Sequence, residues 1–168
     1  LLSTGGALHP EERADLLTRV CPGYLNFYGS TEGGGCTALL PDDPPAAASS
    51  VGRPVFSARL EIVDDNDAPL PEGEVGHIRF QHPGTATAYH NDPERSREAF
   101  RDGWYYPGDL GWTDEAGYLF LAGRAKDMII RGGINVYPAE IEHVLMLHDD
   151  VSEAAVILVQ HLAARAPD

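Results

Sequence analysis

Short apolar runs separated by turn-forming residues occupy the first half of the chain. Residues 10–20 begin with proline and two glutamates and then place apolar residues at helical spacing, so we predict a helix there. Residues 24–28 form a short strand that runs into a turn, and further strands are predicted at 58–63 and 76–80, with a turn at 64–67 between them. This half should therefore be rich in strands.

The pattern continues with a short helix and a hairpin. Residues 93–100 fit a helix that begins at a proline. Residues 103–106 and 118–122 lie on either side of a turn at 114–117, and we predict that they pair as the two strands of a hairpin.

After residue 123 the pattern changes to that of a small α+β unit. A charged cluster is followed by a short apolar run and by Gly132 and Gly133, which can form the turn of a hairpin. A helix with two early glutamates is predicted from Pro138, and residues 154–159 are predicted to form another strand. One face of that helix is expected to pack in a core: Ile141, Val144, Leu145 and His148.

Length, charge and cysteine content narrow the possible functions. The 168 residues suit one medium domain or parts of two, and the formal charge of −14 argues against nonspecific nucleic-acid binding and against docking on anionic membranes. No apolar run approaches the roughly 20 residues that a transmembrane helix needs. Cys21 and Cys36 lie far apart without zinc-ligand spacing, which predicts reduced cysteines in a cytoplasmic protein.

A hydroxyl and a carboxylate stand side by side where the strand at 24–28 ends, in the segment Tyr-Gly-Ser-Thr-Glu at 28–32. Side chains at such a strand end can reach a ligand in a crevice. Thr31 could hydrogen-bond a phosphate oxygen and Glu32 could supply a hard oxygen ligand to Mg²⁺, while Gly29 lets the backbone approach closely. The alternative is a helix cap with a surface acid.

An aspartate on a tight turn is the second candidate for ligand binding. Asp109, within residues 103–111, could accept hydrogen bonds from both hydroxyls of a ribose, although an ordinary Asx turn would also explain it. Arg124 is the natural second ligand for ribose or phosphate, because its fork of donors is always charged and suits oxygen acceptors.

These motifs resemble, in this order, those of the adenylate-forming superfamily: acyl-CoA synthetases, firefly-type luciferases and the adenylation domains of nonribosomal peptide synthetases. Residues 123–142 match the hinge and first hairpin of that family almost without gaps. Residues 28–32 match its Tyr-Gly-x-Thr-Glu motif, and residues 103–111 match Gly-Trp-x-x-Thr-Gly-Asp-Leu-Gly, except that Pro107 replaces the threonine. The Asn-Val-Tyr-Pro sequence at 135–138 resembles the acyl-CoA synthetase branch.

The resemblance implies a role for each residue near the nucleotide. Tyr28 would pack on adenine, and the small-residue loop with Gly6 and Ala7 would hold the same base or form an ordinary turn. Thr31 would contact the α-phosphate and Glu32 would bind magnesium, which makes these two the expected catalytic residues. Nucleotide contacts are thus expected from Gly6, Ala7, Tyr28, Gly29, Thr31, Asp109 and Arg124.

Other residues are implied to act in the second half-reaction. Lys126, which is the one lysine of the chain, aligns with the residue on which relatives pivot the small lobe, so its expected role is a hinge. Gly133 would let the pantetheine thiol pass the backbone after the lobe rotates. In relatives the segment at 33–35 borders the acyl pocket, so these glycines would leave room for a bulky acid or simply form a flexible loop.

The implied fold class is α/β and α+β, with several lobes. Residues 1–123 would be the C-terminal part of a large AMP-binding domain with a β-barrel-like subdomain, and residues 124–168 would be the hinge and first part of a small α+β domain. Both ends are expected to be cuts through a larger protein, because the family's glycine-rich phosphate loop and its late lysine are missing. A piece without these cationic groups is expected to show no turnover by itself.

The implied activity is that of an ATP-dependent acid–thiol ligase, as in fatty acid metabolism. With Mg²⁺ it would form an acyl-adenylate from a carboxylic acid and ATP, then pass the acyl group to coenzyme A. The sequence leaves the acid open, and relatives imply a possible homodimer. Two alternatives stay open: an adenylation domain that loads a carrier protein, and a non-catalytic remnant that binds nucleotide or nothing.

Overall fold

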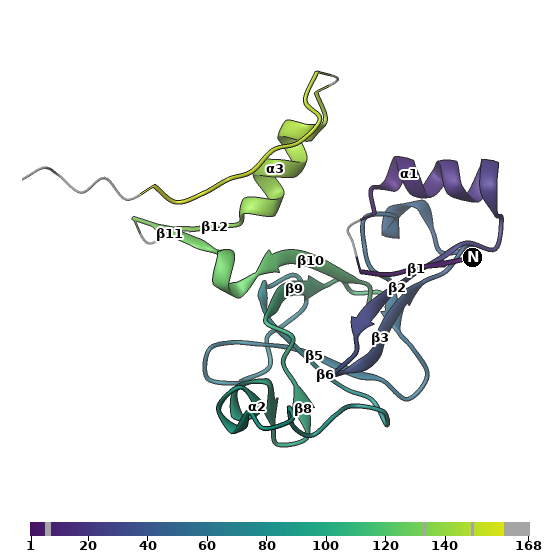
Figure 1. Cartoon of the computed structure of the whole chain (residues 1–168). Helices are drawn as coiled ribbons and strands as arrows, with labels where there is room; N and C mark the ends of the chain where they lie inside the picture. Colours follow the sequence, from purple (N-terminus) through teal and green to yellow (C-terminus); the bar gives the residue numbers. More distant parts are fainter. Residues whose placement is uncertain (6–7, 133, 149, 160–168) are drawn as a thin grey trace, which may run out of the picture. The chain divides into compact units, whose positions relative to one another are not determined.

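The chain divides into two compact units, Leu1–Ala125 and Lys126–Asp168. The structure, a computed structural model, describes residues 1–5, 8–132, 134–148 and 150–159. The first unit contains a four-stranded and a six-stranded sheet, and the second contains a two-stranded hairpin followed by helix α3 (Figure 1).

The first sheet has the strand order β1-β2-β3-β4. Its strands are β1 (Leu2–Ser3), β2 (Leu25–Ser30), β3 (Gly34–Leu39) and β4 (Arg53–Pro54). β1 pairs in parallel with β2, and a parallel pair needs a long crossover. Helix α1 (Pro10–Asp15), continued by a π-helical turn over Leu16–Val20, supplies that crossover, so the helix predicted at 10–20 is confirmed.

The second sheet is built around β6, which pairs with β5 on one side and with β8 and β9 on the other. Its strands are β5 (Arg59–Val63), β6 (Gly76–Gln81), β7 (Phe100–Arg101), β8 (Trp104–Tyr105), β9 (Asp109–Thr113) and β10 (Leu119–Arg124). Helix α2 (Pro93–Ala99) leads into β7. The mixed α/β class is confirmed, and among the described residues this sheet stays open and does not close into a barrel.

The predicted hairpin has a different first strand. β10 pairs with β9, while Trp104–Tyr105 pairs with β6 and β7. The turn itself is correct, because the Asp114 carboxylate accepts from the amides of Ala116 and Tyr118 at 3.0 and 2.8 Å. The prediction placed Asp109 on a tight turn. Gly108 does lie in a bend directly before β9, but Asp109 begins that strand and Gly111 lies within it.

The two sheets of the first unit share one apolar core. Its central residues come from both sheets: Cys36, Ile62, Ile78, Phe80, Tyr105 and Leu119. The Phe80 and Tyr105 rings meet edge to face at 5.4 Å between centroids. Neither cysteine forms a disulfide, and burial raises the pKa of the Cys36 thiol. The sheets are therefore held to each other mainly by buried apolar surface.

The second unit forms the predicted hairpin and helix, but it buries less apolar surface than the sequence predicts. β11 (Ile129–Arg131) and β12 (Ile134–Val136) form the expected hairpin, and α3 (Pro138–Met146) is the expected helix. Residues 154–159, however, form no strand, because they pair with no neighbouring strand in the described part of the chain. The helix face predicted to be core is largely exposed, with Val144 61% and Leu145 47% accessible.

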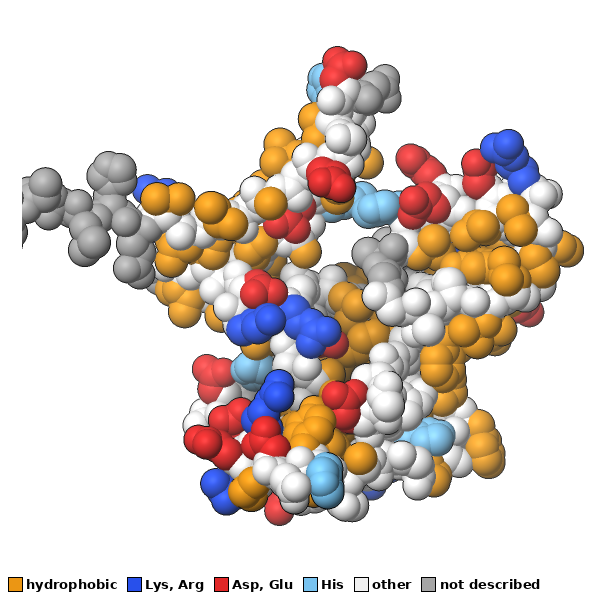
Figure 2. All heavy atoms as spheres, in the orientation of Figure 1, with side chains coloured by type: hydrophobic (Ala, Val, Ile, Leu, Met, Phe, Trp, Pro, Cys, Tyr) orange, Lys and Arg blue, Asp and Glu red, His pale blue; other side chains and the backbone are white. Residues whose placement is uncertain are grey.

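Surface properties agree with the acidic composition. Figure 2 shows acidic side chains spread over the visible face, and hydrophobic side chains gathered along the hairpin and α3. No helix in the described ranges combines the length and the apolar character needed to cross a bilayer.

Candidate functional site

A buried carboxylate joins the two sheets of the first unit. Asp109, the first residue of β9, is 9% exposed. Its Oδ2 accepts a hydrogen bond from the Tyr28 hydroxyl of β2 at 2.6 Å, and its Oδ1 lies 2.8 Å from Nε of Arg124 in β10. The fold therefore brings together three predicted site residues, two of them 81 positions apart in the sequence.

Backbone pairing places Arg124 beside Asp109. The two are register partners at the ends of β10 and β9, beyond a β-bulge in β10. Nη1 of Arg124 donates to the carbonyl of Pro107 at 3.0 Å, and the amide of Ala125 donates to the carbonyl of Gly108 at 2.9 Å. The turn that presents Asp109 is thus held by the end of β10, and the proline that replaces threonine takes part through its carbonyl.

The electrostatics keep Tyr28 as a donor and leave Asp109 able to accept more. Burial first, and then the charge of Asp109, raise the pKa of Tyr28 far above its ordinary value, so the phenol stays protonated. Each carboxylate oxygen has about two acceptor positions, and each oxygen of Asp109 has one protein partner. The Arg124 side chain is 55% exposed and solvent weakens its ion pair, so it remains available to a second anion.

The substitution Tyr28→Phe is expected to lower the free energy of unfolding by about 1.5–3 kcal/mol, the usual worth of a hydrogen bond to a charged group. Urea unfolding of the chain would measure the loss. Tyr106→Phe serves as a comparison, because the Tyr106 hydroxyl donates at 3.1 Å to Asp67, whose side chain is 41% exposed, and accepts at 3.0 Å from Nη1 of Arg79. An unchanged transition in Tyr28→Phe would contradict the importance of the Asp109 bond.

The turn between β2 and β3 carries Thr31 and Glu32. The amide of Ala86 donates to the main-chain carbonyl of Glu32 at 2.7 Å, and the Tyr89 hydroxyl donates to its Oε1 at 3.2 Å. The Thr31 side chain is exposed to solvent. Glu32 is therefore oriented by a loop that follows it by more than 50 positions, while Thr31 is open to a ligand.

The glycines after Glu32 do not leave an empty space. A Cβ atom on Gly33 would lie 2.4 Å from the Phe80 ring and 2.6 Å from the Tyr105 ring, and one on Gly35 would lie 2.2 Å from the Phe27 ring. The expectation that these positions leave room for a bulky acid is wrong at Gly33 and Gly35, because aromatic side chains of the protein itself fill them. Because these glycines have no side chains, the turn that carries Glu32 packs directly against the core.

The other predicted site residues have less defined surroundings. Gly29 lies in β2, where a Cβ atom would be 2.4 Å from the carbonyl oxygen of Gly34, so its close backbone approach is to β3. Lys126 is exposed in a 3-10 turn over Ala125–Asp127. Three candidates lie outside the described residues: Gly6, Ala7 and Gly133.

Tyr89 has a contact with the site that gave no signal in the sequence. It lies between β6 and α2, in a stretch of glycine, threonine, alanine and histidine without hydrophobic periodicity. An aromatic residue alone in such a stretch was the available cue, but its partner, Glu32, is known only once the chain is folded.

The side chains that could act as ligands limit which metal ion the site could bind. No group of three His, Cys, Asp or Glu side chains with metal-ligand geometry occurs among the described residues. Glu32 is a carboxylate with Oε1 bonded to Tyr89. A site with one protein carboxylate fits Mg²⁺, which commonly takes one or two carboxylates together with substrate phosphates and water.

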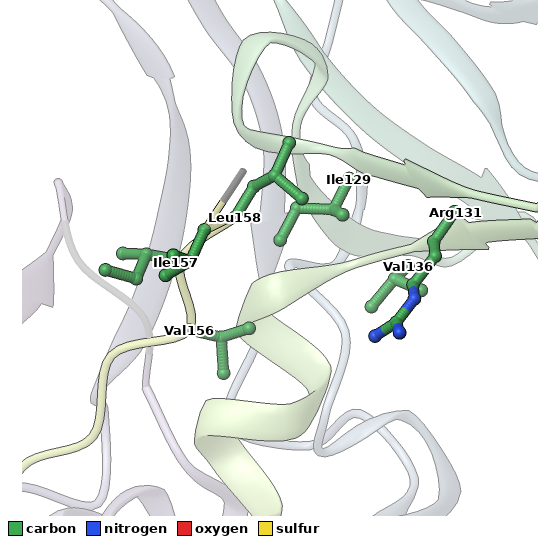
Figure 3. A pocket seen from close by; sticks show the side chains of 7 residues that line it. Ile129, Arg131, Val136, Val156, Ile157 and Leu158 are labelled. Carbon is green, nitrogen blue, oxygen red and sulfur yellow. The ribbon is translucent and has the colours of Figure 1, made fainter. Parts of the chain in front are cut away.

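The second unit has an open apolar hollow beside its hairpin (Figure 3). It is lined by Ile129, Arg131, Val136, Val156, Ile157, Leu158 and Val159. Among the described residues, Arg131 is the one charged side chain in this lining, and none of the described site candidates belongs to it. The described lining of the hollow therefore offers apolar surface and no set of groups for catalysis.

Comparison with known proteins agrees with the motifs. The family model described as "AMP-binding enzyme" matches residues 1–90. The medium/long-chain-fatty-acid–CoA ligase FadD8 of Mycobacterium tuberculosis is 35% identical over 153 residues, which is 90% of this chain and 27% of that protein. The fatty acid–[acyl-carrier-protein] ligase ScoC of Streptomyces coeruleorubidus is 38% identical over 141 residues, or 80% of this chain and 27% of ScoC.

Solved structures give the same result. The O-succinylbenzoate coenzyme A synthetase MenE of Bacillus subtilis, in complex with ATP and a magnesium ion, has a TM-score of 0.84 and 32% identity. That match covers 93% of this chain and 33% of MenE. The chain thus spans about a third or less of the length of these relatives.

Proposed function

This chain belongs to the AMP-binding enzyme family, and from that membership we propose that it is part of a ligase that activates a carboxylic acid with ATP and passes the acyl group to coenzyme A. The observation that carries the proposal is the cluster of Tyr28, Asp109 and Arg124 at the junction of the two sheets. The turn with Thr31 and Glu32 begins directly after β2, the strand that carries Tyr28.

The cluster has the groups that a nucleoside requires. Asp109 would accept hydrogen bonds from the ribose hydroxyls through acceptor positions that Tyr28 and Arg124 leave open. The hydrogen bond to Asp109 fixes the Tyr28 ring, which would pack on the adenine. Arg124 would contact the ribose or a phosphate with the donors that Asp109 and Pro107 do not take.

The turn after β2 has the groups that phosphates require. Thr31, with its exposed hydroxyl, would donate to an α-phosphate oxygen, and Glu32 would bind Mg²⁺. Bound Mg²⁺ would neutralise charge on the phosphates during the transfer.

The reaction consists of two substitutions that the residues of this chain would assist by positioning. In the first, an oxygen of the substrate carboxylate bonds to the α-phosphorus of ATP, the bond to the β-phosphate oxygen breaks, and pyrophosphate leaves. In the second, the thiolate sulfur of coenzyme A bonds to the acyl carbon, the bond between that carbon and the phosphate oxygen breaks, and AMP leaves. Lys126 would act as the hinge between residues 1–123 and 124–168, and Gly133 would lie along the path of the thiol.

Loading of a carrier protein is the second candidate function. It is favoured by the similarity to ScoC, whose name states an acyl-carrier-protein as the acceptor. The acceptor differs, but the adenylation step and its residues would be the same.

The proposal is tested by pyrophosphate exchange in the full-length protein. With Mg²⁺, labelled pyrophosphate should enter ATP when a suitable acid from a panel of fatty, aromatic and short-chain acids is added. Coenzyme A should then release AMP and form a thioester, whereas transfer to a carrier protein instead would support the second candidate. Absence of exchange with every acid would contradict both functions.

A further inference from the structure

We propose that Tyr89 is a positioning residue, which orients the Glu32 carboxylate for the metal-bound phosphates of ATP. The inference rests on the proposed function, because the orientation of Glu32 matters for Mg²⁺ only if the protein uses MgATP. Its basis is the hydrogen bond from the Tyr89 hydroxyl to Oε1 of Glu32 at 3.2 Å, between residues 57 positions apart.

The tyrosine is itself held firmly enough to orient a neighbour. Its ring lies 5.3 Å from that of Phe100, centroid to centroid, and the guanidinium of Arg95 lies 5.8 Å from the centre of its ring. Its amide donates to Oγ of Ser96 at 2.8 Å, which ties it to helix α2. The hydroxyl is therefore presented from a fixed ring, and a fixed donor selects one orientation of a carboxylate.

The loop that carries Tyr89 supports the main chain of the Glu32 turn through residues other than Tyr89. Oγ1 of Thr85 donates to the carbonyl of Gly33 at 2.8 Å, and the amide of Ala86 donates to the carbonyl of Glu32 at 2.7 Å. Both bonds hold the backbone of the turn, and neither involves Tyr89. Loss of the Tyr89 hydroxyl should consequently leave the turn in place and free the Glu32 carboxylate to rotate.

A neutral donor suits this task better than a cation. A phenol is uncharged at neutral pH, because the ordinary pKa of tyrosine is about 10. A lysine or arginine in its place would offset the negative charge that attracts a metal ion. The Tyr89 hydroxyl engages Oε1 without cancelling that charge, and Oε2 can face the ligand.

The test measures metal affinity and does not depend on turnover. The full-length protein is saturated with a non-hydrolysable ATP analogue, and Mn²⁺, as the probe for Mg²⁺, is titrated while free Mn²⁺ is followed by electron paramagnetic resonance. Tyr89→Phe should weaken Mn²⁺ binding about tenfold, since loss of a partner that orients a metal ligand typically costs that much or more. Binding of the analogue in the absence of metal should not change.

Two further variants decide whether the effect passes through Glu32. Tyr106→Phe removes a tyrosine hydroxyl that bonds Asp67 and Arg79 instead of Glu32, and it should leave the Mn²⁺ affinity as in the wild type. In a Glu32→Gln background, adding Tyr89→Phe should have no further effect. A tenfold loss that persists in that background would overturn the positioning role.

The outcomes distinguish this inference from the function on which it rests. If the wild type exchanges pyrophosphate and binds Mn²⁺ with the analogue, while Tyr89→Phe binds Mn²⁺ equally well, the inference alone is wrong. If the wild type neither exchanges pyrophosphate nor binds Mn²⁺ with the analogue, the proposed function fails and the role of Tyr89 fails with it.

Discussion

Asp109→Ala in the full-length protein is expected to weaken AMP binding about 100-fold. The carboxylate would make two hydrogen bonds to the ribose, and bonds to a charged acceptor are each worth about 1.5–3 kcal/mol. A loss of about 3 kcal/mol corresponds to roughly two factors of ten in the dissociation constant. Isothermal titration of AMP into the wild type and the variant measures this difference directly.

A matched control exists in the same unit. Asp67 also accepts from a tyrosine hydroxyl, that of Tyr106, and pairs with an arginine, Arg101, at 3.3 Å. It has the same kinds of partner as Asp109 but lies at a more exposed place, so Asp67→Ala should leave AMP affinity unchanged. Equal AMP affinity in Asp109→Ala and the wild type would contradict the ribose assignment.

Phe80→Ala is expected to lower the free energy of unfolding of the first unit by about 3–5 kcal/mol, as for other buried phenylalanines. Phe80 is fully buried, and its ring contacts those of Tyr105 and Tyr28 edge to face at 5.4 and 6.4 Å. Both tryptophans of the chain, Trp104 and Trp112, lie in the second sheet, so their fluorescence during urea unfolding reports on this unit.

Phe56→Ala provides the control for that measurement. The Phe56 side chain is 96% exposed, and exposed substitutions usually change stability by less than about 0.5 kcal/mol. A loss at Phe80 no larger than the loss at Phe56 would mean that the two sheets do not depend on their shared core.

Much of the fold was predictable because local signals and the folded structure agree. Prolines at the starts of α1, α2 and α3 mark helices, and β5 and β6 follow the predicted strands within about one residue. The strand predictions failed where the formation of a strand depends on pairing with a distant part of the chain. Residues 109–113 form a strand because β6 and β10 pair with them. Residues 154–159 form none, because no strand in the described part of the chain pairs with them.

The candidate site was predictable in its residue types but not in its contacts. Residue chemistry and the resemblance to the family's motifs pointed to Tyr28, Asp109 and Arg124, and the fold brings these three together. The mutual bonds of Tyr28 and Asp109 depend on the packing of two sheets, which no local pattern encodes. The role of Tyr89 was hidden for the same reason, because a hydrogen bond across 57 residues leaves no periodic trace.

The placement of Lys126 has a practical consequence. It is the one lysine in the chain, its side chain is exposed, and it is the first residue of the second compact unit. A protease that cleaves only after lysine therefore has a single target, and the cut would release the strand-rich unit with one extra residue at its end. Limited proteolysis with such an enzyme would therefore separate the two units at the residue where they join.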